Sequence, residues 1–435
     1  MKTINFIPKS IQMFILTIPL MLAPQFILAG VGNPNDDGIK VMTQNLYVGA
    51  DIFKVLNEGQ PIYVNAAEIF ADIITTNFAE RADVIADQIA IKLPHVIGLQ
   101  EVSLIRTQCP SDAITGNTTS NAPDVYADYL QILMDALNAR GLNYQVVASI
   151  QNVDIELPAI NTPQILAGCT DAFFDARLTD YDVTLVRADV SATMVLEQGY
   201  AANFPVPIPA TGGTIVFSRG FTVIDGSYNG IDFRFANTHL EVTGNPYADA
   251  FQFAQAYELT ETLNVIGSTL GEKITFVVGD FNSDPSQGPL VDCFAPPTFA
   301  TFVTDGCVTP HFTMLNAGFI DLWSQLPASA GDGDTCCQSD LLDNQNSELS
   351  QRIDYVWVKL PTNSPLEITS VDASVLGDNL TTNNLWSSDH AGIAAQVMFG
   401  IPVPQMVPTL NLWAILLLVI SMLGVMYFQS RKLNQ

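Results

Sequence analysis

The residues best suited to chemistry directly follow short apolar runs. The stretch Val277–Pro285 reads VVGDFNSDP, so a run typical of a buried strand is followed at once by Asp280, Asn282 and Asp284. Such side chains are costly to bury unless they are paired or bound to a cation, and we therefore expect the run to end at a pocket.

The same pattern, an apolar run ending in a polar cluster, recurs in separate parts of the chain. The other examples are Thr43–Asn45 (TQN), Ile97–Glu101 (IGLQE), Ala236–Glu241 (ANTHLE) and Ser387–His390 (SSDH), and Asp354 stands at the start of an apolar run. Taken singly, each has a common structural explanation, such as a helix cap, an Asx-turn or a structural histidine. Layered α/β proteins place their sites where strand ends meet, so together the clusters indicate one site.

The elements that must position these clusters can be placed from apolar periodicity. Helices are expected near residues 66–92, Tyr126–Arg140 and Tyr247–Ile266, and a surface loop is expected at Gly331–Ser350. Strands are expected at Ile39–Asn45, Val96–Leu99, Tyr144–Ile150, Val183–Arg187, Thr214–Ser218, Phe221–Asp225, Phe233–Asn237 and Ile353–Val358. This mixture predicts an α+β fold in α/β layers, with sheet packed on sheet and helices outside. Residues 39–398 contain no repeat or linker, which favours one domain.

The charge balance limits the partners of the chain. It holds 17 Lys and Arg against 44 Asp and Glu, a formal net charge of −27. Such a body repels polyanions at long range, so any phosphate chemistry must depend on bound cations. Arg187, Arg219 and Arg234 are among the few cations. We expect them to form structural ion pairs, and binding of a substrate phosphate is the alternative.

The first residues predict export. Lys2 and Lys9, the apolar run Ile11–Leu22 and the small residues at 28–30 have the layout of a secretory signal peptide, residues 1–29. A buried first helix is the alternative. The 6 cysteines fit an oxidising compartment, where an even count indicates disulfides. Cys293 and Cys307 would close a short loop, whereas spacing does not fix the other pairings.

The last residues, 407–435, indicate a second targeting signal. Val407-Pro-Thr-Leu precedes an uncharged apolar run from Leu412 to Phe428, which Arg431 and Lys432 follow. That run is about long enough to span a bilayer with its cations in the cytoplasm. The order resembles the IPTL-type C-terminal sorting signals of Gram-negative bacteria, and a plain membrane anchor is the alternative. We therefore expect export across the inner membrane of a Gram-negative bacterium, to the surface, the membrane or the medium.

Five motifs together resemble a known group of enzymes. In chain order they are LQE (Leu99–Glu101), NTHLE (Asn237–Glu241), GDFNSDP (Gly279–Pro285), RIDYVWV (Arg352–Val358) and SSDHAG (Ser387–Gly392). They resemble the endonuclease/exonuclease/phosphatase superfamily, which includes pancreatic-type deoxyribonucleases, apurinic endonucleases, bacterial sphingomyelinases and inositol-polyphosphate 5-phosphatases. The match spans Ile39 to about Met398. It implies a four-layered sandwich of two packed β-sheets flanked by helices.

The resemblance also implies a metal site. Asn45 and Glu101 match the magnesium-binding residues of the family, and Asp389 matches a residue that often assists. Mg²⁺ is the expected ion, with Mn²⁺ or Ca²⁺ as possible substitutes. Its chemical task would be to neutralise the charge of a phosphodiester, which otherwise repels a nucleophile.

The remaining matched residues would carry the catalytic roles. Asp280 and Asn282 match the pair that holds the scissile phosphate and the attacking water. Asp354 matches the acid that orients the histidine at position 390, and His239 matches the second histidine. Either His390 or Asp280 would be the base, and His239 would donate a hydrogen bond to the phosphate or protonate the leaving group.

These observations predict an exported, metal-dependent phosphoester hydrolase. A phosphodiesterase or endonuclease-like enzyme comes first, acting on nucleic acid or phospholipid as a monomer. The alternatives within this superfamily are a sphingomyelinase-like phospholipase or a phosphatase. From another class, the chain could be a non-catalytic, cation-binding acidic surface protein.

Overall fold

A computed structural model describes residues 38–208, 213–244, 246–293, 306–401 and 420–423. The predicted signal peptide and almost all of the predicted C-terminal segment lie outside these ranges. Among the described residues, none forms a helix that is both long and apolar enough to cross a membrane.

Two mixed β-sheets form the centre of the protein. The larger, 8-stranded sheet has the order β17-β18-β1-β2-β6-β3-β4, with β5 also paired to β6, and the 6-stranded sheet has the order β15-β16-β12-β11-β10-β7. The strands of the first sheet are β1 (Ile39–Asn45), β2 (Val96–Gln100), β3 (Leu104–Gln108), β4 (Asp124–Asp128), β5 (Tyr144–Ile160), β6 (Phe173–Arg187), β17 (Glu367–Leu376) and β18 (Gly392–Gly400). Those of the second are β7 (Ser191–Gly199), β10 (Gly220–Tyr228), β11 (Ile231–His239), β12 (Ile274–Asp280), β15 (Ile320–Asp321) and β16 (Asp354–Lys359).

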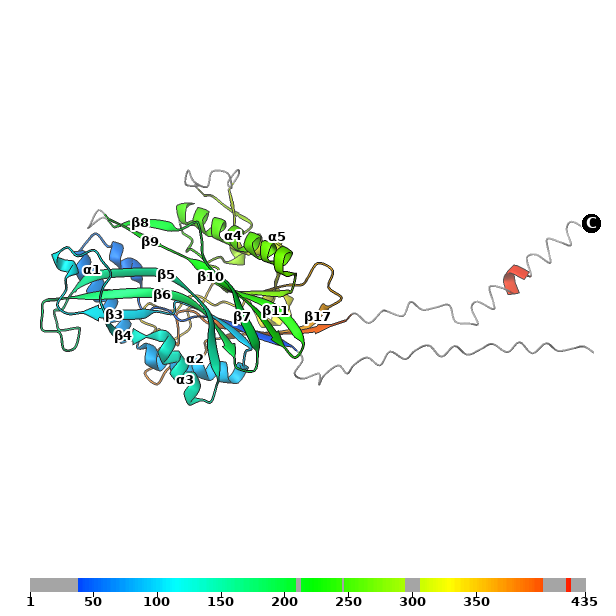
Figure 1. Ribbon diagram of the computed structural model, residues 1–435, viewed down its shortest axis with the longest axis horizontal. Coiled ribbons are helices and arrows are strands. Elements are labelled where there is room, and N and C mark those ends of the chain that lie inside the picture. The colour runs from blue at the N-terminus through cyan, green and yellow to red at the C-terminus, as the bar shows by residue number, and fades with distance from the viewer. Residues whose placement is uncertain (1–37, 209–212, 245, 294–305, 402–419, 424–435) are drawn as a thin grey trace, which may run out of the picture. The chain divides into compact units, whose positions relative to one another are not determined.

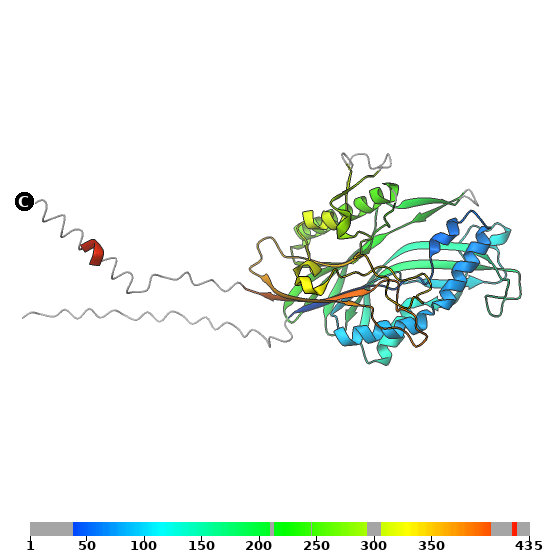
Figure 2. The ribbon, with the colours of Figure 1, turned by 180° about the vertical axis from the view of Figure 1, so that it is seen from behind.

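Helices cover the outer faces of both sheets (Figures 1 and 2). The helices α1 (Ile62–Thr75), α2 (Phe78–Lys92) and α3 (Tyr129–Ala139) bury apolar residues against the first sheet, and α4 (Pro246–Leu270) and α5 (Pro310–Asn316) do so against the second. Two short hairpin-like pairs, β8 (Phe204–Ile208) with β9 (Gly213–Phe217) and β13 (Leu290–Val291) with β14 (Cys307–Val308), complete the β structure among the described residues. The expected α+β sandwich with four layers is therefore confirmed.

Strand β12 shows how the sequence produces these layers. Its apolar residues alternate between the two faces: Phe276 and Val278 join the cluster between the sheets, whereas Val277 joins the cluster under α4. Both faces are covered, so the strand reads as a continuous apolar run instead of an alternating one.

The helical prediction over residues 66–92 was wrong in one respect, because two helices occupy this region. The first ends at Thr75, and Asn77 has a positive φ of 39°, which an α-helix cannot continue through. The prediction for Tyr126–Arg140 began too early, since residues 124–128 pair as β4 with β3. There Asp128 accepts a hydrogen bond from the backbone N–H of Gln131 and caps α3.

Other elements were placed correctly but are longer than expected. The predicted strands at Tyr144–Ile150 and Val183–Arg187 are the ends of two long strands that pair antiparallel over most of their length. Cys293 pairs with Cys307, as predicted, and Cys109 pairs with Cys169. Cys336 and Cys337, adjacent in the chain, are paired with each other, and the backbone of Cys336 bridges to Gln351 and His390.

Candidate active site

Strand register brings the predicted site residues to one edge of the sandwich. In the first sheet β1 and β2 are parallel and Asn45 lies opposite Gln100, so Glu101 follows immediately. In the second sheet β11 and β12 are parallel, with His239 opposite Asp280, and the antiparallel β16 places Asp354 on the other side of Asp280. The carboxyl ends of parallel strands share an edge, so this topology alone gathers residues that are far apart in the sequence.

A cleft of about 1070 Å³, part of which is open to solvent, lies at this edge. The site residues predicted from the sequence that line it are Glu101, His239, Asp280, Asn282, Asp389 and His390. The other two lie directly behind: Asn45 hydrogen bonds to Glu101 and Asp280, and Asp354 to His390. The structure therefore brings the whole predicted set together.

Asn45 joins the ends of the two sheets. Its side-chain Nδ2 donates to Glu101 Oε1 at 3.0 Å and to Asp280 Oδ2 at 3.1 Å, while its Oδ1 accepts from the backbone N–H of Tyr47 at 2.9 Å. The second oxygen of Glu101 accepts from the backbone N–H of Val48 at 2.8 Å. Carboxylates from different sheets are thus held a few ångströms apart around one amide.

The donor set of the cleft fits a divalent cation. Glu101, Asp280 and Asp389 offer hard carboxylate oxygens, which Mg²⁺ and Mn²⁺ prefer. Burial raises the pKa of Asp280 and of Asp389, because the anions are poorly solvated in the cleft. The nearby His390 opposes this rise. A cation among them would supply the compensating charge. Asp280, Asp354 and His390 also offer ligand atoms within 4.8 Å of one another.

His390 is paired with a buried acid. Its Nδ1 lies 2.8 Å from Asp354 Oδ2, and its Nε2 lies 3.7 Å from Asp280 Oδ2. Burial lowers the pKa of His390, but Asp354, Asp389 and Asp280 outweigh that effect and raise it well above the usual value. The carboxylate of Asp354 fixes the tautomer with hydrogen on Nδ1, so Nε2 faces the cleft.

His239 has the opposite environment. Arg219 Nη1 lies 3.0 Å from its Nδ1, and Asn282 Nδ2 lies 3.2 Å from its Nε2. Burial, Arg219 and His390 lower the pKa of His239 well below the usual value, so the imidazole is neutral. Both neighbours present donor nitrogens, and the nearer, charged Arg219 makes Nδ1 the acceptor. The hydrogen of the neutral ring is then on Nε2, whose contact with Asn282 Nδ2 is not a hydrogen bond and whose nearby acceptor is Asp280 Oδ2 at 3.5 Å. This geometry suits a hydrogen-bond donor better than a general acid.

Three residues at the cleft adopt a left-handed backbone that is uncommon for side chains other than glycine. Their φ angles are 57° for Tyr47, 54° for Glu101 and 49° for Asn282. Strained positions of this kind persist where the surrounding structure fixes them, and they gather at functional sites. Here each one turns the chain sharply after a strand and directs a side chain into the cleft.

Several cleft residues were missed in the sequence. Tyr47, Asn152 and Asp180 line it, and Asn152 Nδ2 donates to Asp180 Oδ2 at 3.0 Å. Asp182 lies behind Asp180 and is fully buried, with a strongly raised pKa caused by burial and then by Asp180. The sequence did contain a sign of this acidic pair, because residues 180 and 182 of a strand lie on the same face.

Arg81 positions the site from behind. This fully buried side chain donates to the backbone carbonyls of Leu46 at 2.6 Å, Tyr47 at 3.0 Å and Ser387 at 3.2 Å. It therefore ties the turn after β1 to the segment that carries Asp389 and His390. Its place in an amphipathic helix gave no sign of this role.

Four other charged residues singled out in the sequence have structural partners. Asp284 is not part of the site, because it accepts from the backbone N–H groups of Ser286 and Arg352 and caps a turn. Arg187 and Arg234 form the expected ion pairs with Asp189 and Asp225. Arg219 forms one too, with Glu241 at 3.8 Å, and it also lines the cleft and contacts His239.

Comparison with known proteins gives results at the level of three-dimensional structure alone. No protein-family model matches the chain, and no curated protein matches its sequence. An endonuclease/exonuclease/phosphatase family protein from Leptotrichia buccalis aligns at 18% identity and a TM-score of 0.44, over 83% of this chain and 100% of that one. The motifs resemble the same family.

Two further solved structures align over a similar part of the chain. A mannosyl-6-phosphatase from Bacteroides thetaiotaomicron aligns at 15% identity and a TM-score of 0.45, over 83% of this chain and 100% of that one. Truncated TDP2 of Caenorhabditis elegans aligns at 15% identity and a TM-score of 0.42, covering 83% and 98%. At these scores the alignments by themselves give no substrate and no reaction.

Proposed function

We propose that this protein is a divalent-cation-dependent phosphoester hydrolase that acts on phosphodiesters. One observation carries the proposal: Asn45 links the carboxylates of Glu101 and Asp280, and the His390–Asp354 pair and His239 flank Asp280 from other segments. This arrangement suits attack of water on a phosphorus atom. A site that only binds a cation would not need two histidines whose pKa values are shifted in opposite directions.

Glu101 and Asp389 would hold the cation, beside Asn45 at the end of β1. Mg²⁺ or Mn²⁺ at this position would neutralise the negative charge of the phosphate and polarise its oxygens. Asn282, whose Nδ2 is held 3.0 Å from the Leu240 carbonyl oxygen, would orient the phosphate. Neutral His239 would donate from Nε2 to a phosphate oxygen.

The proton of the attacking water would pass to Asp280, or to Nε2 of His390 when a bound cation offsets the carboxylates that otherwise keep this imidazole charged. Asp280 Oδ2 and His390 Nε2 lie 3.7 Å apart. The bond from the water oxygen to phosphorus forms as the bond to the ester oxygen breaks. The departing oxygen takes up a proton from solvent, and the base returns the proton of the attacking water to solvent. Asp354 would keep His390 in position throughout. These roles account for each predicted catalytic residue.

Hydrolysis of bis-p-nitrophenyl phosphate by the purified full chain tests the proposal. We expect turnover with Mg²⁺ or Mn²⁺, loss of turnover in EDTA and recovery when the metal is returned. Asp280→Asn should lower kcat at least about 100-fold because it removes the central carboxylate. Asp372→Asn changes an exposed acid on β17 and serves as the matched control. If the protein hydrolysed none of the phosphoesters tested, a non-catalytic, cation-binding protein would be favoured instead.

We also propose that the protein is exported. The pairing of Cys109 with Cys169 and of Cys293 with Cys307 supports an oxidising compartment. Expression in a Gram-negative host should give a mature N-terminus near residue 30, outside the cytoplasm. A cytoplasmic protein that keeps Met1 would contradict this.

A further inference from the structure

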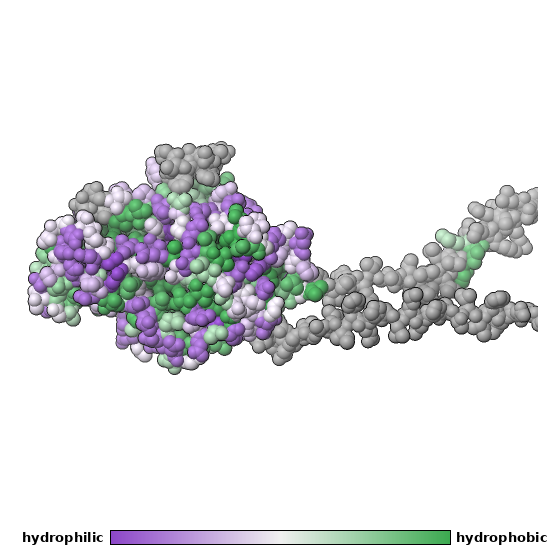
Figure 3. Space-filling model, viewed as in Figure 1, coloured by the Kyte–Doolittle hydropathy of each residue, from purple (hydrophilic) through white to green (hydrophobic). Residues whose placement is uncertain are grey.

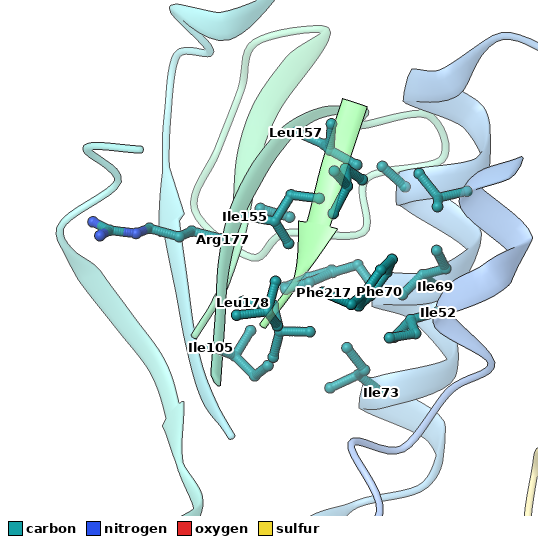
Figure 4. A pocket seen from close by; sticks show the side chains of 15 residues that line it. Ile52, Ile69, Phe70, Ile73, Ile105, Ile155, Leu157, Arg177, Leu178 and Phe217 are labelled. Carbon is teal, nitrogen blue, oxygen red and sulfur yellow. The ribbon is translucent and has the colours of Figure 1, made fainter. Parts of the chain in front are cut away.

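An apolar pocket lies between α1 and the long strands β5 and β6 (Figure 4). It encloses about 640 Å³, part of which is open to solvent. Ile69, Phe70 and Ile73 of α1 form one wall, and Ile155 and Leu157 of β5 form part of the opposite wall. The space is therefore walled by hydrocarbon from two different layers of the fold.

Arg177 is the one charged residue among the described residues that line this pocket. Its guanidinium points away from the cavity (Figure 4) and binds both oxygens of Asp154, at 2.7 and 2.6 Å. Only its aliphatic stem therefore contributes to the wall. Water in such a space finds few hydrogen-bond partners, so an apolar occupant is favoured.

The apolar pocket adjoins the catalytic cleft. Four residues line both: Ile52, Val153, Leu178 and Phe217. Phe53 lies at the cleft with its ring 5.6 Å from that of Phe217 and is 37% exposed. On the neighbouring β9, Val216 is 47% exposed, and Figure 3 shows apolar residues gathered over the β8–β9 pair. A molecule that fills both spaces has a phosphate at one end and a hydrocarbon chain at the other.

We propose that the apolar pocket binds the aliphatic chain of a lipid-like phosphodiester whose phosphate occupies the cleft. This inference rests on the proposed function, because it names the substrate class of the same site. The charges agree with it. Arg219 is the one Lys or Arg among the described cleft residues, whereas non-specific binding of nucleic acid depends on many such contacts.

A chain-length series tests the inference with a constant leaving group. Alkyl p-nitrophenyl phosphodiesters with methyl, butyl, hexyl and octyl chains would be compared below their critical micelle concentrations. We expect kcat/KM to rise about threefold to fourfold for each added methylene that enters the pocket. A kcat/KM that does not depend on chain length would overturn the inference.

Two variants link the chain-length effect to this pocket. Ala66→Trp on α1 would fill the cavity, and Ile69→Gln would make its wall polar while retaining a good helix former. Each should reduce the ratio of octyl to methyl kcat/KM at least tenfold. Ile91→Trp, at a position on α2 that is 72% exposed, is the control and should keep the wild-type ratio. A wild-type ratio in both folded pocket variants would contradict the proposal.

Binding of cis-parinaric acid in EDTA separates this proposal from the proposed function. This fluorescent fatty acid carries no phosphoester, so its binding needs no catalysis. We expect wild type and Ile91→Trp to bind it, and Ala66→Trp to bind at least tenfold more weakly. Hydrolysis of the methyl p-nitrophenyl phosphodiester without parinaric acid binding would refute only the proposed lipid-binding role of the pocket. Parinaric acid binding without hydrolysis of any phosphodiester would refute only the proposed hydrolase activity.

Discussion

The strands beneath the cleft differ between their first and their last residues. Ile39 and Val41 of β1 and Phe233 and Phe235 of β11 are fully buried in the cluster between the sheets. The same strands end in Asn45 and His239, which face other polar groups. The apolar ends hold the two sheets together, and the polar ends carry the chemistry. If this division is correct, substitutions at the polar ends should lower kcat of the folded protein, whereas substitutions at the apolar ends should lower only the free energy of unfolding.

The largest expected effect is at the polar end. His390→Ala should lower kcat about 1000-fold on bis-p-nitrophenyl phosphate, since it removes an acid–base group and the partner of Asp354. The free energy of unfolding should also fall, by about 3 kcal/mol, because the variant leaves the buried carboxylate of Asp354 without its partner. Steady-state kinetics and urea unfolding measure the two quantities. A folded variant with wild-type kcat would leave Asp280 as the base.

The next effect is expected at the boundary between the two ends. Asn237 lies between the sheets, donates to the carbonyls of Leu99 and Val183 at 3.0 and 3.1 Å, and accepts from Gln100 Nε2 at 2.6 Å. Asn237→Ala would leave these buried groups unpaired, and we expect a loss of about 3 kcal/mol in unfolding free energy. Asn138→Ala, on the exposed side of α3, is the control and should change it by less than about 0.5 kcal/mol.

Position 98 accepts no residue larger than glycine, because the side chain of Asn237 lies against it. A Cβ on Gly98 would lie 2.5 Å from Asn237 Oδ1 and from a methyl carbon of Val278. The close approach of the sheets at this point therefore depends on glycine. It explains why the motif before Glu101 contains a residue without a side chain.

A smaller effect is expected at the apolar end. Val358→Ala on β16 removes two buried methyl groups from the cluster between the sheets. It should lower the free energy of unfolding by about 2 kcal/mol and leave kcat of the folded protein unchanged. Val265→Ala on α4, where the side chain is 59% exposed, is the matched control. A large fall in kcat in Val358→Ala would break the division between the two ends.

The smallest effect concerns pH. Burial and then Arg187 lower the pKa of His95 to about 3, and its Nδ1 accepts from the backbone N–H of Lys40 at 3.0 Å. Below about pH 6.5 the unfolded chain takes up a proton that the folded chain does not, so stability falls as the pH falls. His95→Asn keeps an acceptor near Nδ1 but cannot titrate. The loss of unfolding free energy between pH 7 and 5.5 should therefore be about 1 kcal/mol smaller than in wild type. An equal loss would mean that His95 is not buried as a neutral group.

The sequence predicted the layers and most of the site, because both depend on local patterns. Apolar runs that end in Asn45, Glu101 or Asp280 mark strand ends, and ordered motifs mark which of them belong together. It did not predict the break at Asn77, the capping role of Asp284 or the position of Arg219 beside His239. These depend on contacts between distant segments, as does the buried Arg81. The apolar pocket escaped notice for the same reason, since its walls come from separate elements.

Divalent cation binding tests the central claim most directly. Titration with Mn²⁺, followed by electron paramagnetic resonance, should show a site in wild type that Glu101→Gln weakens at least tenfold. Glu367→Gln, an exposed acid on β17 of this strongly acidic protein, controls for diffuse binding and should keep wild-type affinity. Equal Mn²⁺ affinity in Glu101→Gln and wild type would contradict a cation site at the strand ends.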